Sequence, residues 1–339
     1  MKNSSKQNLV ANPSSFRRFT PARAGQLTYS CLGLLPLLGG LFVLAAGAAG
    51  QGLLKEHASA DGVWGVSEFQ SLTNFQTRVI LITDSEGTVL VIDPVSGSEV
   101  HYQGGLLQRP YGIAIDRDGT ILVTDTSALA VIRIDPRTGR QEVVVSGPEY
   151  GVMFGIALDD DGFIYVANVE TILRIDPRTR QVERYPRGRL GTTLGVTVGG
   201  RGELYVADAA GAVWRLNPRN GAQHLVAKGG YLVQPCGIVA DQNGRLYVTD
   251  LATRRIVEID ARNGKQRLVT EGENLVSPVG IAIENDEYLL VGDPDAFGLL
   301  GGIIRVEIST GQQSRVGIGN DSLQNYRCVV VALLPLLSE

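Results

Sequence analysis

Residues 110–125 read PYGIAIDRDGTILVTD, and this stretch decides the fold. A short apolar run follows a glycine, a D-x-D-G turn interrupts the pattern, and a second apolar run ends in aspartate. Asp and Gly adopt turn conformations at low cost, and short runs rich in β-branched residues favour strands over helices. The stretch therefore predicts a β-hairpin.

The same hairpin pattern recurs along the chain at a nearly fixed spacing. Its glycine returns every 40 to 43 residues, at Gly112, Gly155, Gly195, Gly237 and Gly280. The closing position keeps the same spacing, as Asp84, Asp125, Asn168, Asp208, Asp250 and Asp293. Each unit continues with an alternating run, an Asp-Pro-type turn and a polar strand. Four short strands in a repeat of this length predict the blade of a β-propeller.

The number of units predicts six blades. Five complete units begin near Pro110, Met153, Thr193, Pro235 and Pro278. The first unit, 79–102, has its last three strands and no innermost strand before them. The C-terminal stretch 323–331 aligns without a gap with 107–115, so we expect it to supply the missing strand. The expected fold is all-β, a six-bladed propeller of four antiparallel strands per blade, whose first blade is closed by the C-terminal strand.

The first fifty residues differ in composition from the rest of the chain. They contain five basic and no acidic residues, and the run from Cys31 to Gly50 carries no charge. An uncharged run of this length predicts membrane insertion, and the small residues at its end resemble a signal-peptidase site. We expect residues 1–50 to be a cleaved signal peptide or an uncleaved anchor, 51–74 a linker and 75–339 the propeller. The propeller would then be exported, to the periplasm or the extracellular space, with 31–50 as its membrane tether if uncleaved.

Net charge narrows the range of partners. The whole chain carries a formal charge of −4, and removal of residues 1–50 leaves −9. An acidic surface argues against nucleic acid as a partner and against binding to anionic lipid by charge. We expect a monomer with a protein or small-molecule ligand, unless the chain is part of a complex.

The repeated pattern P-x-G-I-A-I-D-x-D-G-x-I-x-V-x-D resembles the NHL repeat over about residues 75–335. It is more loosely similar to the gluconolactonase/senescence-marker and strictosidine-synthase-like propellers. NHL-like propellers include extracellular sensor domains, protein- or RNA-binding modules and an amidating lyase. The resemblance therefore implies the fold and leaves the function to be argued from a site.

The mouth of a propeller channel is lined by the residues just before each innermost strand. In this chain they are Tyr111, Phe154, Leu194, Cys236, Val279 and, on the split blade, Tyr326 and Arg327. Gluconolactonase-like enzymes carry Asn and Asp metal ligands at this place, and none of these residues is a carboxylate, amide or imidazole. We expect the mouth to bind a ligand through apolar contacts, with no metal or other cofactor.

Histidines and aspartates are the other candidates for catalysis. The amidating-lyase resemblance implies histidines in the site, but His101 and His224 fall on outermost strands and His57 precedes the propeller. The aspartates that end the second strands recur in nearly every unit, which favours a structural role as acceptors of backbone N–H groups. We therefore predict no catalytic residue.

One loop departs from the repeat. Residues 293–302, DPDAFGLLGG, form a longer connection than the equivalent 250–255 and contain Phe297, Leu299 and Leu300. Apolar side chains on an exposed loop indicate a partner contact, and the alternative is that they fold over the edge of the blade.

Three functions remain open from the sequence. The leading hypothesis is a non-catalytic, exported propeller that binds a protein, a glycan or a small ligand through its channel face. The second is a lyase- or lactonase-like enzyme with an atypical site, for which Tyr111, Tyr326 and Arg327 are the candidates. The third is a sensor or assembly part of a membrane complex, tethered by residues 31–50.

Overall fold

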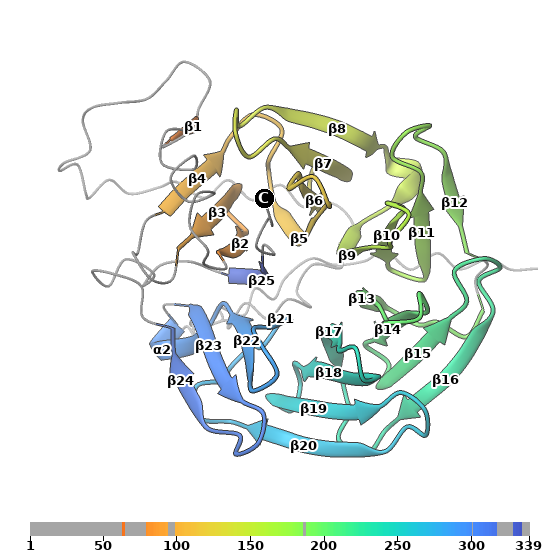
Figure 1. The fold of residues 1–339 in the computed structure, drawn as a ribbon, viewed down its shortest axis with the longest axis vertical. Helices are drawn as coiled ribbons and strands as arrows, with labels where there is room; N and C mark the ends of the chain where they lie inside the picture. The colour runs from red at the N-terminus through yellow and green to blue at the C-terminus, as the bar shows by residue number, and fades with distance from the viewer. Residues whose placement is uncertain are drawn as a thin grey trace, which may run out of the picture. The chain divides into compact units, whose positions relative to one another are not determined.

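The computed structural model describes residues 63–64, 79–93, 99–185, 188–299, 301–316 and 328–333. Six antiparallel sheets follow one another around a ring (Figure 1). Five of them have four strands and the first has five. The predicted six-bladed β-propeller is therefore confirmed. The leader and most of the expected linker lie outside the described residues.

The two inner strands of blades two to six begin close to the predicted positions. The innermost strands are β5 (Pro110–Ile115), β9 (Met153–Leu158), β13 (Thr193–Val198), β17 (Pro235–Ala240) and β21 (Gly280–Ile283). The second strands are β6 (Ile121–Asp125), β10 (Ile164–Asn168), β14 (Leu204–Asp208), β18 (Arg245–Asp250) and β22 (Tyr288–Asp293).

The two outer strands complete each blade, and the fourth strands run along the circumference of the ring (Figure 1). The third strands are β7 (Ala130–Ile134), β11 (Thr171–Ile175), β15 (Ala212–Leu216), β19 (Arg255–Asp260) and β23 (Gly302–Glu307). The fourth strands are β8 (Gln141–Ser146), β12 (Val182–Arg184), β16 (Gln223–Lys228), β20 (Gln266–Glu271) and β24 (Gln313–Arg315).

Blade one joins the two ends of the propeller. It contains β2 (Ile80–Asp84), β3 (Thr88–Ile92) and β4 (Glu99–Gln103), and its innermost strand is β25 (Cys328–Leu333). The predicted closure by the C-terminal strand is therefore confirmed. The fifth strand, β1 (Val63–Trp64), pairs with the outer edge of β4 and lies within the segment expected to be a linker.

Burial explains the apolar character of the second strands. In β2, β6, β10 and β14 every residue is buried, because each of these strands has another blade on both sides. The fourth strand β4 alternates between buried and more exposed residues instead, since only one of its faces meets the core. The hydrophobic core therefore lies between the blades, in layers contributed by neighbouring sheets.

Short helical turns occur only in connections among the described residues. The turn η1 (Pro148–Tyr150) connects blades two and three, and α2 (Ala296–Leu299) lies in the long loop of blade six. Phe297 and Gly298 have left-handed backbone angles, so α2 is an irregular turn.

The recurring glycine lies where one blade touches the next. A Cβ atom on Gly237 would lie 2.3 Å from the carbonyl oxygen of Val279 in the following blade. One on Gly112 would lie 2.5 Å from the carbonyl oxygen of Phe154. Only a residue without a side chain permits this approach of two backbones, which explains the period of the glycine.

A threonine of the second strand adds a hydrogen bond between blades at the same place. The Thr249 hydroxyl donates to the carbonyl oxygen of Val279 at 3.1 Å and accepts the Gly237 N–H at 2.7 Å. Equivalent bonds to the next blade join Thr83 to Tyr111 and Thr124 to Phe154. These bonds fix the backbone of the residues predicted to line the channel mouth.

Candidate functional site

The structure brings the predicted mouth residues together at the centre of the ring. Cys236 and Val279 are each 1% exposed, and Tyr111 and Leu194 pack against them. The Tyr111 hydroxyl lies 3.5 Å from Sγ of Cys236, which belongs to the blade opposite in the six-membered order. The Tyr111 ring also meets the edge of Phe154, with 5.2 Å between ring centroids.

These contacts fill the middle of the ring at this level. Two opposite blades touch through Tyr111 and Cys236, so the side chains form an apolar plug rather than the wall of an open tunnel. Leu251, in the turn after Asp250, completes the plug and is 8% exposed. The sequence analysis missed Leu251, although it is an apolar residue directly after the recurring aspartate. A ligand at the mouth would have to contact the outer surface of this cluster.

The pairing of β25 corrects the alignment of the C-terminal strand. The Cα atom of Cys328 lies opposite Asp84, as that of Pro110 lies opposite Asp125. The ungapped alignment had instead made Cys328 the equivalent of Gly112, which is two residues after Pro110. Val329 therefore takes the chain position that corresponds to Tyr111. Tyr326 and Arg327 lie outside the described residues, so their role at the mouth stays a prediction.

The recurring aspartates have the structural role that their repetition indicated. Oδ2 of Asp125 accepts the backbone N–H groups of Gln108 and Arg109, at 2.7 and 2.8 Å. Oδ1 accepts those of Ser127 and Ala128, at 3.0 and 2.8 Å. One carboxylate thus ties the loop that enters the blade to the turn that follows the second strand.

In blade three the residue at the equivalent position donates hydrogen bonds, whereas Asp125 accepts them. Its Asn168 side chain donates to the carbonyl oxygen of Val152 at 3.0 Å and also to that of Tyr150. The turn η1 presents carbonyl oxygens here instead of N–H groups, and an amide can donate where a carboxylate cannot. The one exception to the Asp pattern therefore has a local structural cause.

The described histidines lie away from the plug. His101 is on β4 and His224 on β16, both outermost strands as predicted, and His57 lies outside the described part. His101 contacts Glu99 at 3.1 Å. Within the ranges that the structure describes, no group of three or more His, Cys, Asp or Glu side chains is placed to hold a metal ion.

The long loop of blade six is folded onto its own blade at Phe297. The ring is half-buried against the core of blades five and six, and the Arg315 guanidinium lies 4.9 Å from its centroid. Phe297 is therefore less exposed than a contact loop would require. The side chain of Leu299 and all of Leu300 lie outside the described residues. The contact loop stays a prediction for these two.

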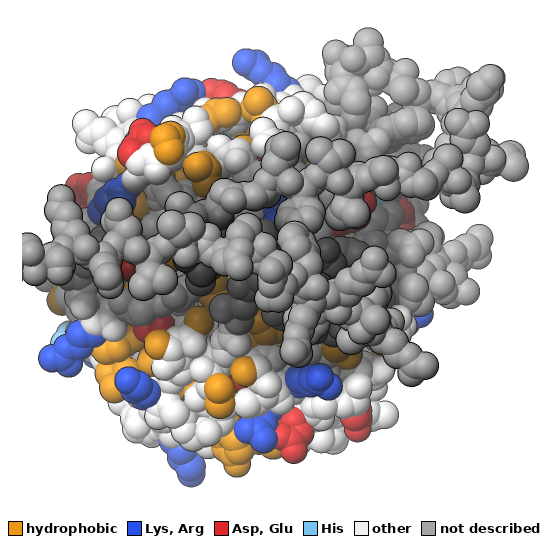
Figure 2. All heavy atoms as spheres, turned by 180° about the vertical axis from the view of Figure 1, so that it is seen from behind, with side chains coloured by type: hydrophobic (Ala, Val, Ile, Leu, Met, Phe, Trp, Pro, Cys, Tyr) orange, Lys and Arg blue, Asp and Glu red, His pale blue; other side chains and the backbone are white. Residues whose placement is uncertain are grey.

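Exposed apolar side chains occur instead on two loops that lead into innermost strands. Leu106, Tyr231 and Val233 are 37%, 37% and 53% exposed. The N–H groups of Tyr231 and Val233 are held by Gln266 at 2.8 Å and Asp250 at 2.7 Å. On the coloured part of the face shown in Figure 2, hydrophobic side chains lie in small groups between charged ones. None of these three residues was predicted from the sequence.

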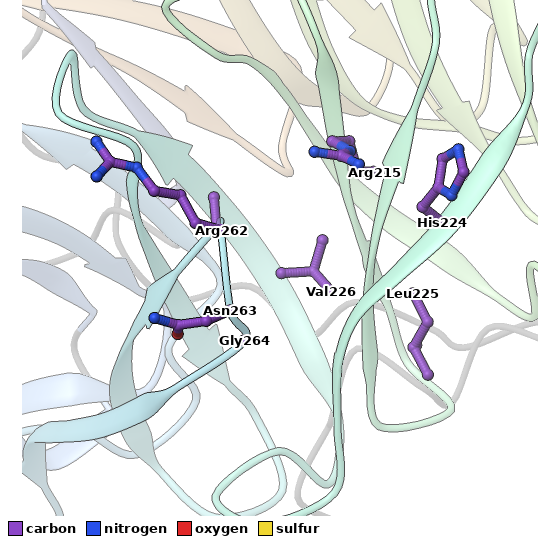
Figure 3. A pocket seen from close by; sticks show the side chains of 8 residues that line it. Arg215, His224, Leu225, Val226, Arg262, Asn263 and Gly264 are labelled. Carbon is purple, nitrogen blue, oxygen red and sulfur yellow. The ribbon is translucent and has the colours of Figure 1, made fainter.

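A groove of about 170 Å³ lies between the outer strands of blades four and five (Figure 3). Its polar lining consists of Arg215, His224, Arg262 and Asn263, with Leu225 and Val226 beside them. The sequence analysis placed His224 on an outer strand and identified no groove there.

Across the residues that the structure describes, no helix has the length and apolar character needed to cross a membrane. The uncharged run 31–50 is not among these residues. Its role as a signal or anchor stays a prediction.

The geometry defines a six-bladed β-propeller with an apolar central plug, and known proteins share parts of it. No protein-family model matches the chain. Over 88 residues it is 34% identical to the peptidyl-glycine alpha-amidating monooxygenase of Mus musculus and 33% identical to that of Rattus norvegicus. The matched stretch is 26% of this chain and 9% of each of those proteins, so the chain spans about a tenth of the length of these relatives.

Solved structures share the fold at low sequence identity. A chain in the crystal structure of a nidogen/laminin complex matches with a TM-score of 0.66 and 17% identity, over 76% of this chain and 98% of that one. Virginiamycin B lyase from Staphylococcus aureus matches with a TM-score of 0.51 and 18% identity, over 63% and 72%. These likenesses support the propeller architecture.

Proposed function

We propose that this chain is an exported, non-catalytic NHL-type β-propeller that binds a partner protein through the end of the ring carrying the loops into the innermost strands. The observation that carries the proposal is the exposure of Tyr231 and Val233, together with Leu106, on these loops. Each loop leads to the start of an innermost strand, so all of them approach the same end of the ring. Glycans and small ligands at this end are the alternatives that the experiment separates.

The polar groups of this end support binding rather than catalysis. The carboxylates of Asp125 and Asp250 accept backbone N–H groups, and the mouth side chains pack on one another. The exposed groups are instead an aromatic and two aliphatic side chains, held on loops that hydrogen bonds fix. Rigid aromatic and apolar anchors are typical of protein contact sites.

The test is partner capture by the full-length chain in its own cells. A photo-crosslinking residue at position 231 should yield a discrete adduct with a protein. The substitutions Tyr231→Ala and Val233→Ala should together reduce recovery of that partner at least tenfold. Leu225→Ala is the matched control, because Leu225 is 49% exposed but lies on an outer strand. Equal loss in the control, or adducts with glycan alone, would contradict the proposal. N-terminal sequencing of the chain from fractionated cells tests export and cleavage.

A second candidate is a lyase-type enzyme, and the stretch similar to the amidating monooxygenases favours it. This candidate places the reacting groups at the mouth, at Tyr111, Tyr326 and Arg327. It requires that Tyr111→Phe and Arg327→Gln abolish turnover of an amidated or lactone substrate while leaving the melting temperature unchanged. Retention of activity in both variants excludes this site.

A further inference from the structure

Blades two, three and five share an acid–base pair between their third and fourth strands, whereas Arg305 of blade six lies opposite Ser314 and pairs with Glu284. The pairs of directly opposite residues are Arg133 with Glu142 in blade two, Arg174 with Glu183 in blade three and Glu258 with Arg267 in blade five. Arg174 and Glu183 form an ion pair at 3.2 Å. Opposite residues of an antiparallel pair project from the same face, so charge compensation is built into this position.

Blade four departs from this arrangement. Arg215 lies opposite His224, so a histidine stands where blades two and three have glutamate. Figure 3 shows Arg215 and His224 near each other on blade four, and Arg262 on the next blade with its guanidinium turned away from them. No aspartate or glutamate is among the residues that line the groove here. The position therefore carries basic groups without the usual acidic partner among the lining residues.

The neighbouring turn adds to the positive charge. In blade two the acid of the pair, Glu142, is also bound by Arg180 from the turn of blade three. The equivalent turn of blade five presents Arg262 and Asn263 to blade four. Its own carboxylate, Asp260, accepts the Arg262 N–H and the Asn263 amide, both at 2.8 Å, and is thus engaged within the turn.

Charges of both signs act on the Tyr205 phenol, which lies opposite Arg215 in the sheet. Burial and the Glu203 carboxylate raise the pKa of the Tyr205 phenol, while the positive charges of Arg215 and Arg201 act in the opposite direction. The Arg262 guanidinium donates to the carbonyl oxygen of Asn243 at 3.3 Å. The Arg262 guanidinium is thus held by a neutral oxygen atom, whereas the Glu203 carboxylate acts on the same Tyr205 phenol as Arg215 does.

We propose that the groove between blades four and five binds an oxyanion, a phosphate, sulfate or carboxylate group carried by a ligand. A guanidinium presents a planar fork of N–H donors that matches such oxygens, and an imidazole and an amide supply further donors. Leu225, half-exposed beside the groove, offers an apolar contact to the remainder of the ligand. The site is separate from the loops of the proposed partner contact and stands independently of that function.

The experiment uses the histidine signals of the full-length chain, purified in a mild detergent. The chain has three histidines, so His224 is assigned from one variant, His224→Gln. Titration with inorganic phosphate should shift the His224 imidazole resonances in a saturable way and leave those of His101, which contacts Glu99, unchanged. Parallel titrations with sulfate and acetate show which oxyanion binds most tightly.

Two substitutions and one matched control decide the assignment. Arg262→Gln should weaken phosphate binding roughly threefold to tenfold, the range expected for one charge-assisted contact in a partly solvated site. His224→Glu restores the pair of blades two and three and should abolish the rise in melting temperature with phosphate at constant ionic strength. Lys228→Gln also removes one positive charge, but at the end of β16 that is far from the groove. It should change neither the affinity for phosphate nor the rise in melting temperature.

Both substituted residues are exposed, so the variants are expected to fold, and unchanged melting temperatures without phosphate verify this. A linear, equal shift of His101 and His224 would overturn the proposal. So would equal weakening of phosphate binding by Lys228→Gln and Arg262→Gln.

Discussion

The inner and outer halves of the blades use their repeated residues differently. In the inner strands, Gly237 and Thr249 contact the backbone of the next blade at Val279, and Asp250 binds the loop that enters its own blade. In the outer strands of blades two, three and five the recurring feature is a pair of opposite charges, whose order is reversed in blade five.

Residues therefore recur in the inner and outer strands for two different physical reasons. The position of Gly237 tolerates only glycine, because an added Cβ atom would meet the backbone of the next blade. A partly exposed charge pair tolerates reversal and replacement, since its net contribution to stability is small. New binding sites can therefore arise in the outer half, as at Arg215 and His224, at little cost to the ring.

The sharpest test of the inner half is Gly237→Ala. The new Cβ would meet the Val279 carbonyl oxygen at 2.3 Å, and backbone atoms cannot move aside as a flexible side chain can. We expect a loss of roughly 2–4 kcal/mol in the free energy of unfolding. Urea unfolding of the full-length chain, followed by the fluorescence of the buried Trp214, measures it.

The matched control is Gly200→Ala. Its nearest neighbour, the Gln242 carbonyl oxygen, is 3.5 Å from the added Cβ, and the backbone of Gly200 is not left-handed. We expect this variant to lie between neutral and about 1 kcal/mol more stable. If both alanines have the same effect, the close approach of the blades does not explain the period of the glycine.

The same distinction explains which parts of the structure the sequence could predict. The inner strands begin at or near the predicted residues, at Pro110 and Met153 for example, because the recurring glycine meets the backbone of the next blade and the residue that ends each second strand binds the adjoining loop. The role of Asp125 as a backbone acceptor followed from its repetition alone. The described mouth residues pack on one another at the centre, since the propeller geometry places them near the start of the innermost strands, and their role in binding stays a prediction.

The errors arose where the sequence lacks such a constraint. The run Val329–Val331 consists of three valines, and a shift of two residues along the strand keeps the same side chains on each face. The register of β25 could therefore not be determined from the sequence. For Phe297 the sequence left open whether the side chain is exposed or folds over the blade edge, because its left-handed turn has no counterpart in the other units. The groove beside Arg215 depends on which outer residues lie opposite one another, and therefore on pairing between strands.

A smaller effect is expected from Thr249→Val, which keeps the shape of the side chain and removes the hydroxyl. The Val279 carbonyl oxygen and the Gly237 N–H would each lose this partner at a buried position. We expect a loss of roughly 1–3 kcal/mol. Thr138→Val, on an exposed turn, should change stability by no more than about 0.5 kcal/mol. Equal effects would show that the bond between blades adds nothing to the packing.

The smallest expected effects on stability concern two buried tyrosines of the second strands. Tyr165 and Tyr247 occupy equivalent positions and are each 1% exposed. The Tyr165 hydroxyl donates to Asp159 at 2.8 Å, whereas that of Tyr247 has no hydrogen-bond partner among the described residues. We expect Tyr165→Phe to cost about 1 kcal/mol and Tyr247→Phe to be neutral or slightly stabilising at neutral pH, as urea unfolding would show. The reverse order would contradict this difference between blades three and five.

The pH dependence of Tyr247→Phe gives an independent check. Burial raises the pKa of Tyr247 to about 12, although the nearby Arg245 acts in the opposite direction. The unfolded chain then releases the phenolic proton before the folded one, so the free energy of unfolding falls as the pH rises from about 10 to 12. Below pH 10 the phenol is protonated in both states and this loss is absent. Tyr247→Phe should therefore make the fall between pH 10 and 12 less steep, and an unchanged slope would show that the phenol titrates as if exposed.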